Sequence, residues 1–299
     1  MADFTDSFWS IYVAIITAVS IAFCLFLLLA NSRKPPKTAD NTTGHVWDGD
    51  IREANNPLPL WWMGLFVITI VFAAIYLVWY PGMGSFAGAG GWSSTGQYEG
   101  ERQALEERQA PIFAAFTGKP ATELTRDPAA LAIGERLFMN NCAQCHGSDA
   151  RGAKGFPNLT DGDWLWGSSA EIIQETIAKG RHGVMPPMAA AVGAGNVEPL
   201  AHYVRSLSGL AHDPVRRDLG RASFAAVCAA CHGADGKGNT ALGAPNLTDR
   251  VWLHGSSIAD ISATITQGRE NVMPAHGNML TAAQIHVLSA YVLSRSGSR

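Results

Sequence analysis

Two copies of the pentapeptide Cys-x-x-Cys-His contain the most chemically distinctive residues of this chain. One copy runs from Cys142 to His146 and the other from Cys228 to His232. At the end of a helix, cysteines three residues apart lie on one face, so both thiols can bond to the vinyl groups of one haem while the adjacent imidazole points at the iron. The two strings therefore predict two covalently bound haem c groups. The predicted thioether residues are Cys142, Cys145, Cys228 and Cys231, and the predicted axial ligands are His146 and His232.

Cysteine pairs of this spacing also occur in zinc sites and in redox disulfides. Neither alternative explains a histidine directly after the second cysteine in both strings. A zinc site built from four cysteines would need two pairs closer together than the 86 residues from Cys142 to Cys228, or would leave both histidines unused. Covalent haem is therefore the favoured interpretation.

The two strings lie in an internal repeat. The offset is 86 residues at the cysteines and 88 residues from Pro157 and Pro245 onward, as far as Tyr203 and Tyr291. The segments 129–209 and 216–296 are therefore two versions of one small domain. Each segment is about the size of a small monohaem cytochrome c.

Within each repeat, a glycine and a phenylalanine precede the first cysteine by eight and four residues. These residues are Gly134 and Phe138 in the first repeat, and Gly220 and Phe224 in the second. The pattern resembles class I cytochromes c, in which these positions pack the first helix against the last. Ordinary amphipathic packing would give a similar pattern. The matching positions of the last helix are Leu200 with Tyr203, and Leu288 with Tyr291.

The same resemblance assigns a role to Pro157 and Pro245. They fall where the family uses a proline carbonyl to accept a hydrogen bond from the ligand imidazole, eleven and thirteen residues past His146 and His232. Such a bond would fix the tautomer of the ring and make it a better donor to iron. A plain turn proline is the alternative.

The sixth iron ligands are predicted to be Met185 and Met273, which repeat within the sequence Val-Met-Pro. The following proline disfavours helix at each methionine and keeps the chain extended there. Three neighbouring residues compete for this role, namely Met188, Met279 and His276, the last of which aligns with Met188. The sequence leaves open whether each methionine completes the haem of its own repeat or that of the neighbouring repeat.

Ligation by histidine and methionine leaves no open position on the iron for oxygen or peroxide. The chain is therefore expected to transfer electrons, and no catalytic residue is predicted. The fold is expected to be mainly α, with long glycine-rich loops around the cofactors, because no period-two strand pattern appears in the repeats.

The first hundred residues contain two long apolar runs, 7–30 and 60–80. As a helix, the first run would be about 36 Å long, enough to cross a bilayer. No basic residue precedes it, and it is too long for the core of a cleaved secretory signal, so a retained membrane helix is favoured. Cys24 lies within it as an apolar residue. Interfacial aromatic residues flank the second run, namely Trp61, Trp62, Trp79 and Tyr80.

Basic residues predict the orientation in the membrane. Four of them lie between the two runs, whereas 1–6 and 81–101 contain none. By the positive-inside rule, the connecting loop faces the cytoplasm and both termini face the periplasm, where bacterial c-type haem is attached. We therefore expect a bacterial inner-membrane protein with a periplasmic haem-bearing part. The four residues are Arg33, Lys34, Lys37 and Arg52.

The predicted organisation is two N-terminal transmembrane helices followed by two tandem class I cytochrome c domains. A segment that begins glycine-rich and becomes charged from Glu99 to Arg108 is interpreted as a tether with a short solvated helix. A net charge of −3 argues against nucleic-acid binding. The expected boundaries are 1–32 for the first transmembrane helix, 33–57 for a cytoplasmic loop, 58–80 for the second helix, 81–128 for a periplasmic linker, and 129–209 and 216–296 for the cytochrome domains.

The stretch from Thr42 to Ile51, followed by Asn55 to Trp62, narrows the family further. It closely resembles the segment that leads into the membrane helix of the diheme subunit of cbb3-type cytochrome c oxidases, subunit III of the CcoP or FixP type. The resemblance implies a non-catalytic electron-transfer subunit of an oxygen reductase. It also implies a periplasmic cytochrome c donor, a monohaem cytochrome c subunit, a catalytic subunit with haem b and copper, and contact with membrane lipid. His45 and Trp47 are expected to be interfacial or packing residues.

Two other classes of protein share some of these features. A free-standing membrane diheme carrier, or the cytochrome subunit of a dehydrogenase, would have the same haem domains but gives no reason for the segment from Gly44 to Trp62. A diheme peroxidase needs one haem with an available coordination site. Two equivalent Val-Met-Pro sequences argue against a peroxidase.

Overall fold

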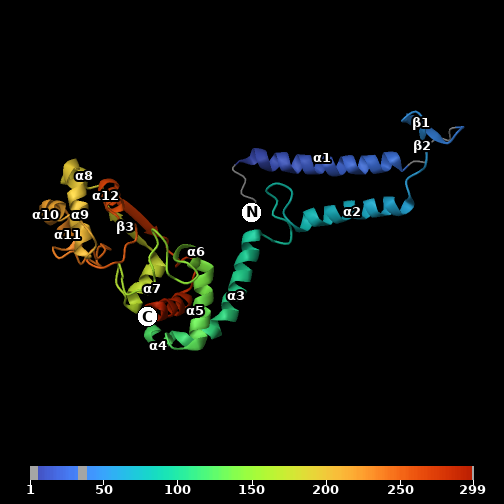
Figure 1. The fold of residues 1–299 in the computed structure, drawn as a ribbon. Coiled ribbons are helices and arrows are strands. Elements are labelled where there is room, and N and C mark those ends of the chain that lie inside the picture. Colours follow the sequence, from blue (N-terminus) through green and yellow to red (C-terminus); the bar gives the residue numbers. More distant parts are fainter. Residues whose placement is uncertain (1–5, 33–38, 298–299) are drawn as a thin grey trace. The chain divides into compact units, whose positions relative to one another are not determined.

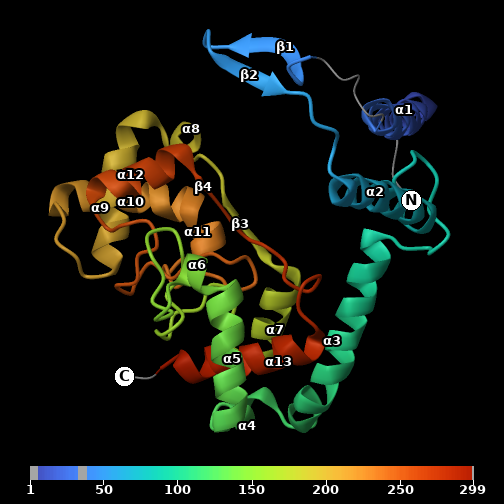
Figure 2. The ribbon, with the colours of Figure 1, turned by 90° about the vertical axis from the view of Figure 1, so that its right-hand side faces the viewer.

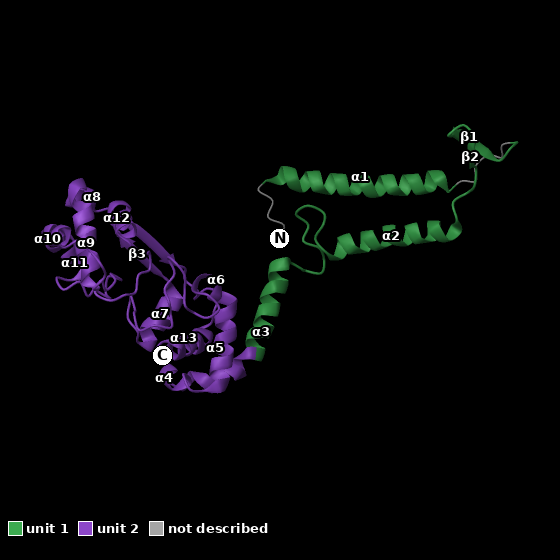
Figure 3. Cartoon of the chain, in the orientation of Figure 1, with its two compact units in different colours: residues 1–108 green, residues 109–299 purple. Residues whose placement is uncertain are grey.

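The computed structural model describes residues 6–32 and 39–297 of the chain, which are mainly helical. The chain divides into two compact units, residues 1–108 and residues 109–299 (Figure 3). The first unit contains the two apolar helices, and the second contains both sequence repeats. The prediction of a mainly α fold with two candidate membrane helices is confirmed.

The candidate membrane helices are α1 (Ser7–Asn31) and α2 (Leu60–Trp79). Neither contains an ionised side chain, and Leu28 is the one buried residue among their described residues, as expected for helices that lipid would surround. The carboxylate of Asp6 caps α1 by accepting a hydrogen bond from the main-chain nitrogen of Phe8 at 2.9 Å.

A β-hairpin that the sequence did not predict connects the two helices (Figure 1). It consists of β1 (Thr42–Trp47) and β2 (Ile51–Ala54), which pair antiparallel. Asp48 and Gly49 have positive φ angles of 49° and 86°, as a tight hairpin turn requires. Of the basic residues used for the orientation, Arg52 lies in β2, whereas Arg33, Lys34 and Lys37 lie outside the described residues.

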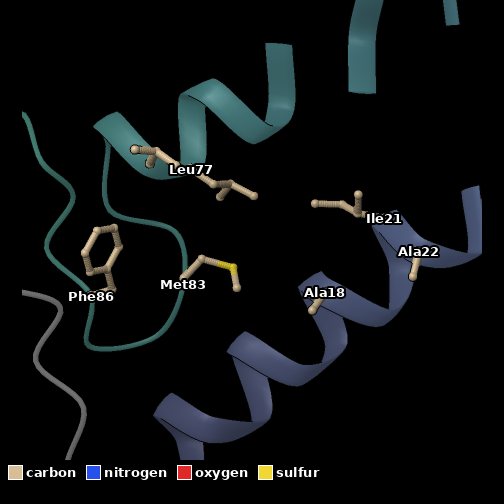
Figure 4. A pocket seen from close by; sticks show the side chains of 7 residues that line it. Ala18, Ile21, Ala22, Leu77, Met83 and Phe86 are labelled. Atoms are coloured by element: carbon tan, nitrogen blue, oxygen red, sulfur yellow. The ribbon is translucent and has the colours of Figure 1, made fainter. Parts of the chain in front are cut away.

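The loop after α2 turns back and contacts the start of α1. Both the main-chain nitrogen and the hydroxyl of Ser85 donate to the hydroxyl oxygen of Ser10 at 2.8 Å. Gly84 has a φ of 61° and lies so close to Ser10 that a side chain there would clash. Small side chains on α1 leave an apolar groove of about 560 Å³ between the two helices and this loop (Figure 4). Its lining includes Ala18, Ile21, Ala22, Leu77, Met83 and Phe86.

The second unit is built from short helices and two strands. The end of α3 (Ser94–Thr117) belongs to it from residue 109 onward. The elements that follow are α4 (Ala121–Leu124), α5 (Pro128–Asn141), α6 (Ala143–His146), α7 (Ala170–Lys179), β3 (Arg181–Met185), α8 (Ala189–Val192), η1 (Ala194–Asn196), α9 (Val197–Leu207), α10 (Pro214–Ser223), η2 (Phe224–Cys228), α11 (Ala229–His232), α12 (Ile258–Gln267), β4 (Arg269–Met273) and α13 (Ala282–Arg295).

The two repeats exchange their last helices. Helix α13, from the end of the second repeat, packs against α5 and α7 of the first repeat, as Figures 1 and 2 show. Helix α9, from the end of the first repeat, packs against α10 and α12 of the second. We call α4 to α7 with α13 the first module, and α8 to α12 the second module. Each module therefore contains residues of both sequence repeats.

The chain crosses between the modules at β3 and β4, which pair antiparallel with Gly183 opposite Asn271. These two residues are 88 positions apart, the offset of the repeat, so the strand pair relates the two modules by an approximate twofold axis. These two short strands were not predicted from the sequence, although the mainly α prediction holds. Side chains alternate between half-buried and exposed along each strand, but five residues are too few for that alternation to stand out in the sequence.

Close helix crossings confirm the predicted packing role of the two glycines. A Cβ atom on Gly134 would lie 2.5 Å from the Cβ of Tyr291, and one on Gly220 would collide with the carbonyl of Pro199. The ring centroids of Phe138 and Tyr291 are 5.5 Å apart, and those of Phe224 and Tyr203 are 5.2 Å apart. Both phenylalanines are fully buried.

The first module extends upstream of the repeat. Phe113 and Phe116, near the end of α3, are buried in one cluster with Leu124 of α4, Ala130 of α5 and Val287 of α13. The apolar end of α3 and helix α4 thus pack together against α5 and α13 of the first module. The packed structure begins before residue 129, where the sequence repeat starts.

The exchange of the last helices predicts that substituting each of two equivalent leucines destabilises the first helix of the other repeat. Leu288→Ala removes a fully buried side chain from the first module, and Leu200→Ala removes one from the second. Each should cost about 2–5 kcal/mol of stability through the lost burial and the remaining cavity. In hydrogen-exchange mass spectrometry of the purified protein, Leu288→Ala should speed exchange in residues 128–141, and Leu200→Ala in residues 214–223. Faster exchange of 214–223 in Leu288→Ala would show that the helices are not exchanged.

Candidate haem-binding sites

A short helical turn presents each Cys-x-x-Cys-His string. Cys142 ends α5, and α6 carries the chain on to His146. In the second repeat, the π-helical segment η2 ends at Cys228, and α11 leads to His232. A glycine with a positive φ follows each histidine, which ends the turn and lets the chain fold back beneath the imidazole.

All five cysteines are free thiols in the structure. Cys142 and Cys228 are half-buried, whereas Cys145 and Cys231 are exposed. Burial, with a smaller effect from Cys145, raises the pKa of the Cys142 thiol to about 11. Burial also raises the pKa of Cys228. Redox-active cysteines instead have lowered pKa values, so the environment does not favour a catalytic dithiol.

The two histidines are oriented as the sequence predicted. Nδ1 of His146 lies 2.9 Å from the carbonyl oxygen of Pro157, and Nδ1 of His232 lies 3.1 Å from that of Pro245. A carbonyl can only accept, so Nδ1 must carry the hydrogen. In the neutral ring Nε2 then has a free lone pair, the form in which imidazole binds iron. Burial lowers the pKa of His146, which favours the neutral ring.

A glycine near each string allows the proline carbonyl to come close to the imidazole. Gly152 follows the first string with a φ of 68°, and a Cβ there would collide with the carbonyls of Phe156 and Pro157. Its main-chain nitrogen donates to the carbonyl of His146 at 2.7 Å. Gly238 does the same for His232 at 2.8 Å. The glycine-rich loops therefore hold the acceptors for both imidazoles.

The predicted methionine ligands lie at the ends of the crossing strands. Met273, at the end of β4, packs against the buried cluster of the first module that includes Phe138, and Cys142 and Trp164 pack against the same cluster. Met273 therefore belongs to the module that contains the Cys-x-x-Cys-His string of the other repeat. Met185, at the end of β3, is half-buried. Since β3 and β4 are related by the approximate twofold axis, Met185 holds the equivalent position on the way into the second module.

The competing residues differ in their surroundings. The side chain of Met279 is exposed to solvent. Met188 is half-buried against the cluster of the second module that includes Cys228 and Trp252. His276 is buried in the first module. Among the described residues, no three His, Cys, Asp or Glu side chains come together as a cation site, so the geometry does not support the zinc alternative.

Three unpaired buried nitrogens test whether the modules suit a haem. Nε of Arg205 and Nε1 of Trp252 in the second module, and Nδ1 of His276 in the first, find no hydrogen-bond partner among the described residues. Buried polar atoms are nearly always paired. Haem carries carboxylate groups that can accept hydrogen bonds, so these donors fit a bound haem beside each string. From the sequence, His276 was predicted only as a competing iron ligand. No motif in the sequence indicated a role for Trp252.

An ion pair and one aromatic side chain connect the two modules outside the strand pair. Nζ of Lys154 lies 3.3 Å from a carboxylate oxygen of Asp260. The ring of Trp166 lies 5.2 Å below the guanidinium of Arg181, the first residue of β3. Trp166 in turn covers Gly243 of the second repeat. Beside them, residues 162–168 and 237–246 line a polar cavity of about 510 Å³.

Comparison with known proteins shows two family matches. Residues 39–87 match the N-terminal domain of cytochrome oxidase-cbb3, FixP. Residues 129–204 and 216–292 each match the family described as cytochrome c oxidase, cbb3-type, subunit III. The two matches of the second family coincide with the two sequence repeats.

Curated relatives cover nearly the whole chain. The cbb3-type cytochrome c oxidase subunit CcoP of Rubrivivax gelatinosus is 57% identical over 99% of this chain and 97% of its own length. Subunit FixP of Bradyrhizobium sp. (strain ORS 278) is 43% identical over 86% of this chain and 95% of its own length. Subunit CcoP of Cereibacter sphaeroides is 38% identical over 86% of this chain and 94% of its own length.

Asp163, which lines the polar cavity, should make stability depend on pH. Burial raises the pKa of Asp163 from 3.8 to about 6, with further contributions from Asp249 and Asp161. The folded chain therefore binds a proton more tightly than the unfolded chain, and stability should fall as pH rises from about 4 to 6. Asp163→Asn should remove this loss, whereas Asp218→Asn, at an exposed site, should keep it. Thermal unfolding at several pH values measures the difference, and an unchanged slope in Asp163→Asn would contradict it.

Proposed function

This chain belongs to the family of cbb3-type cytochrome c oxidase subunit III, the CcoP and FixP subunits, and we propose that it passes electrons from a periplasmic cytochrome c to the catalytic core of that oxidase. The observation that carries the proposal is the orientation of the two imidazoles. In both modules a proline carbonyl fixes the hydrogen on Nδ1 and leaves Nε2 free for iron.

We assign one covalent haem c to each string. Cys142 and Cys145 would form the thioethers in the first module, and Cys228 and Cys231 those in the second. When bound, haem c supplies an iron that gains and loses one electron. The chain's own residues hold that iron in a partly buried environment and at a fixed orientation.

We propose that the methionine ligands are exchanged together with the last helices. Met273 would complete the site of His146, because it packs against the same buried cluster of the first module as Cys142. By the approximate twofold relation of β3 and β4, Met185 completes the site of His232. With a histidine and a methionine both available to hold the iron, neither module would offer a site for oxygen or peroxide. The chain therefore acts as a non-catalytic electron-transfer subunit and not as a diheme peroxidase.

We propose that the chain lies in a bacterial inner membrane, which its two long apolar helices support. We propose that the hairpin between them is cytoplasmic and that both termini and both modules are periplasmic, since basic residues of the sequence are concentrated between the spans. The partners follow from the family. They are the catalytic subunit with haem b and copper, a monohaem cytochrome c subunit, a soluble or membrane-bound cytochrome c donor, and lipid around α1 and α2.

Purification from the membrane in mild detergent tests the function. The intact chain should carry the added mass of two haem groups, and Cys142→Ser with Cys145→Ser should carry one. Oxygen uptake driven by reduced cytochrome c should fall to background in this variant, while a small reductant that reaches the catalytic subunit directly should still support uptake. Co-purification of c-type haem without b-type haem or uptake would instead favour the free-standing carrier.

A single-haem background tests the exchange of methionines. In a chain with Cys228→Ser and Cys231→Ser, only the first module should hold haem. There, Met273→Leu should abolish the red absorption band of ferric iron bound to methionine and lower the reduction potential, because methionine raises it. Met185→Leu is the matched control and should change neither. Loss of the band in Met185→Leu, with Met273→Leu unaffected, would show that each methionine serves its own repeat.

A further inference from the structure

The two modules present different side chains at one equivalent position. Met188 and His276 each lie three residues past a predicted methionine ligand. The main-chain nitrogen of Met188 donates to the carbonyl of Ile265 at 2.8 Å, and that of His276 donates to the carbonyl of Ile177 at 3.0 Å. The two carbonyls are themselves one repeat apart. The backbone is thus held alike in both modules, and only the chemistry of the side chain differs.

The position of His276 is closely fixed. Its carbonyl accepts hydrogen bonds from the main-chain nitrogens of Met279 at 3.0 Å and Leu280 at 2.8 Å, and the next residue, Gly277, donates to the carbonyl of Ala178 at 3.0 Å. The side chain is only 9% exposed. An imidazole on a backbone held in this way has little freedom to turn its ring toward water.

Nδ1 of His276 is buried and has no hydrogen-bond partner among the described residues. Such a donor is costly to leave unpaired, so its partner is expected to be a group that the polypeptide itself does not supply. The main-chain nitrogen of His276 donates to the carbonyl of Ile177, whose side chain belongs to the buried cluster against which Met273 and Cys142 pack. The unpaired nitrogen therefore lies near the proposed haem site of the first module. Met188 has no N–H or O–H group to offer the second module.

We propose that His276 donates a hydrogen bond from its ring to a carboxylate of the haem in the first module, and so raises the reduction potential of that haem alone. The inference rests on the proposed haem sites. A donor directed at the carboxylate offsets negative charge beside the iron, which favours the reduced state. His276 is thus a positioning residue that tunes the haem. It gives two modules of nearly equal architecture different reduction potentials.

The test uses the purified full-length protein with its haems and replaces His276 by the residue of the other repeat. In a spectroelectrochemical titration, His276→Met should move the wave of the first module to lower potential and leave the second wave unchanged. The red band of methionine-bound ferric iron should persist in both modules. His276→Gln, which keeps an N–H donor, should restore most of the potential, and Met279→Leu, at the exposed neighbour, should have no effect.

Three results would overturn the proposal. An unchanged first wave in both His276→Met and His276→Gln would show that the imidazole does not act on the haem. A wave that moves to higher potential in His276→Met, with a methionine band that the native first module lacks, would show that His276 is itself the axial ligand. If the His276→Met variant does not retain haem, His276→Leu takes its place. A native reduction potential of the first module in His276→Leu would also reject the proposal. Failure of the proposed function is distinct, because the native chain would then carry no covalent haem and show no c-type waves.

Discussion

The antiparallel pairing of β3 with β4 is the contact on which the arrangement of the second unit depends. It brings Gly183 opposite Asn271 and sends each repeat's C-terminal segment into the other module. Neither repeat can then bury its own first helix, because Phe138 is covered by α13 and Phe224 by α9. The two modules are therefore parts of one folding unit. The two proposed haem sites, held in one folding unit, would keep a fixed separation, which a pair of independently folded domains on a flexible linker would not.

The exchange is consistent with chain connectivity. Helix α9 is followed after the short segment 208–213 by α10, and these two neighbours in sequence pack together. Packing against the next helix closes a short loop, whereas returning to α5 would close a much longer one. Once α9 is used in the second module, α5 has only α13 left as a partner of suitable shape. The crossing strands then bring α13 back.

Much of the site could be predicted from the sequence, because its signals are local. The Cys-x-x-Cys-His strings, the proline acceptors and the glycines at the helix crossings each depend on a few residues at fixed spacing. The choice of helix partner could not be predicted, because Leu200 with Tyr203 and Leu288 with Tyr291 suit either first helix equally well. The strands and the packed end of α3 were missed for a related reason. Their structure depends on tertiary contacts across the repeats and not on a periodic pattern of their own.

The approximate twofold relation between the repeats also shows at which equivalent positions the two modules differ. Both repeats contain the glycine, proline and methionine positions that the fold and the proposed haem sites require. Where equivalent positions differ in chemistry, the packing does not impose the choice. Trp166 and His254 are one such pair, and Met188 and His276 are another. Two electron-transfer sites with identical surroundings would give an electron no preferred direction between them. Side chains that break the symmetry near one site and not the other supply that preference without altering the shared backbone.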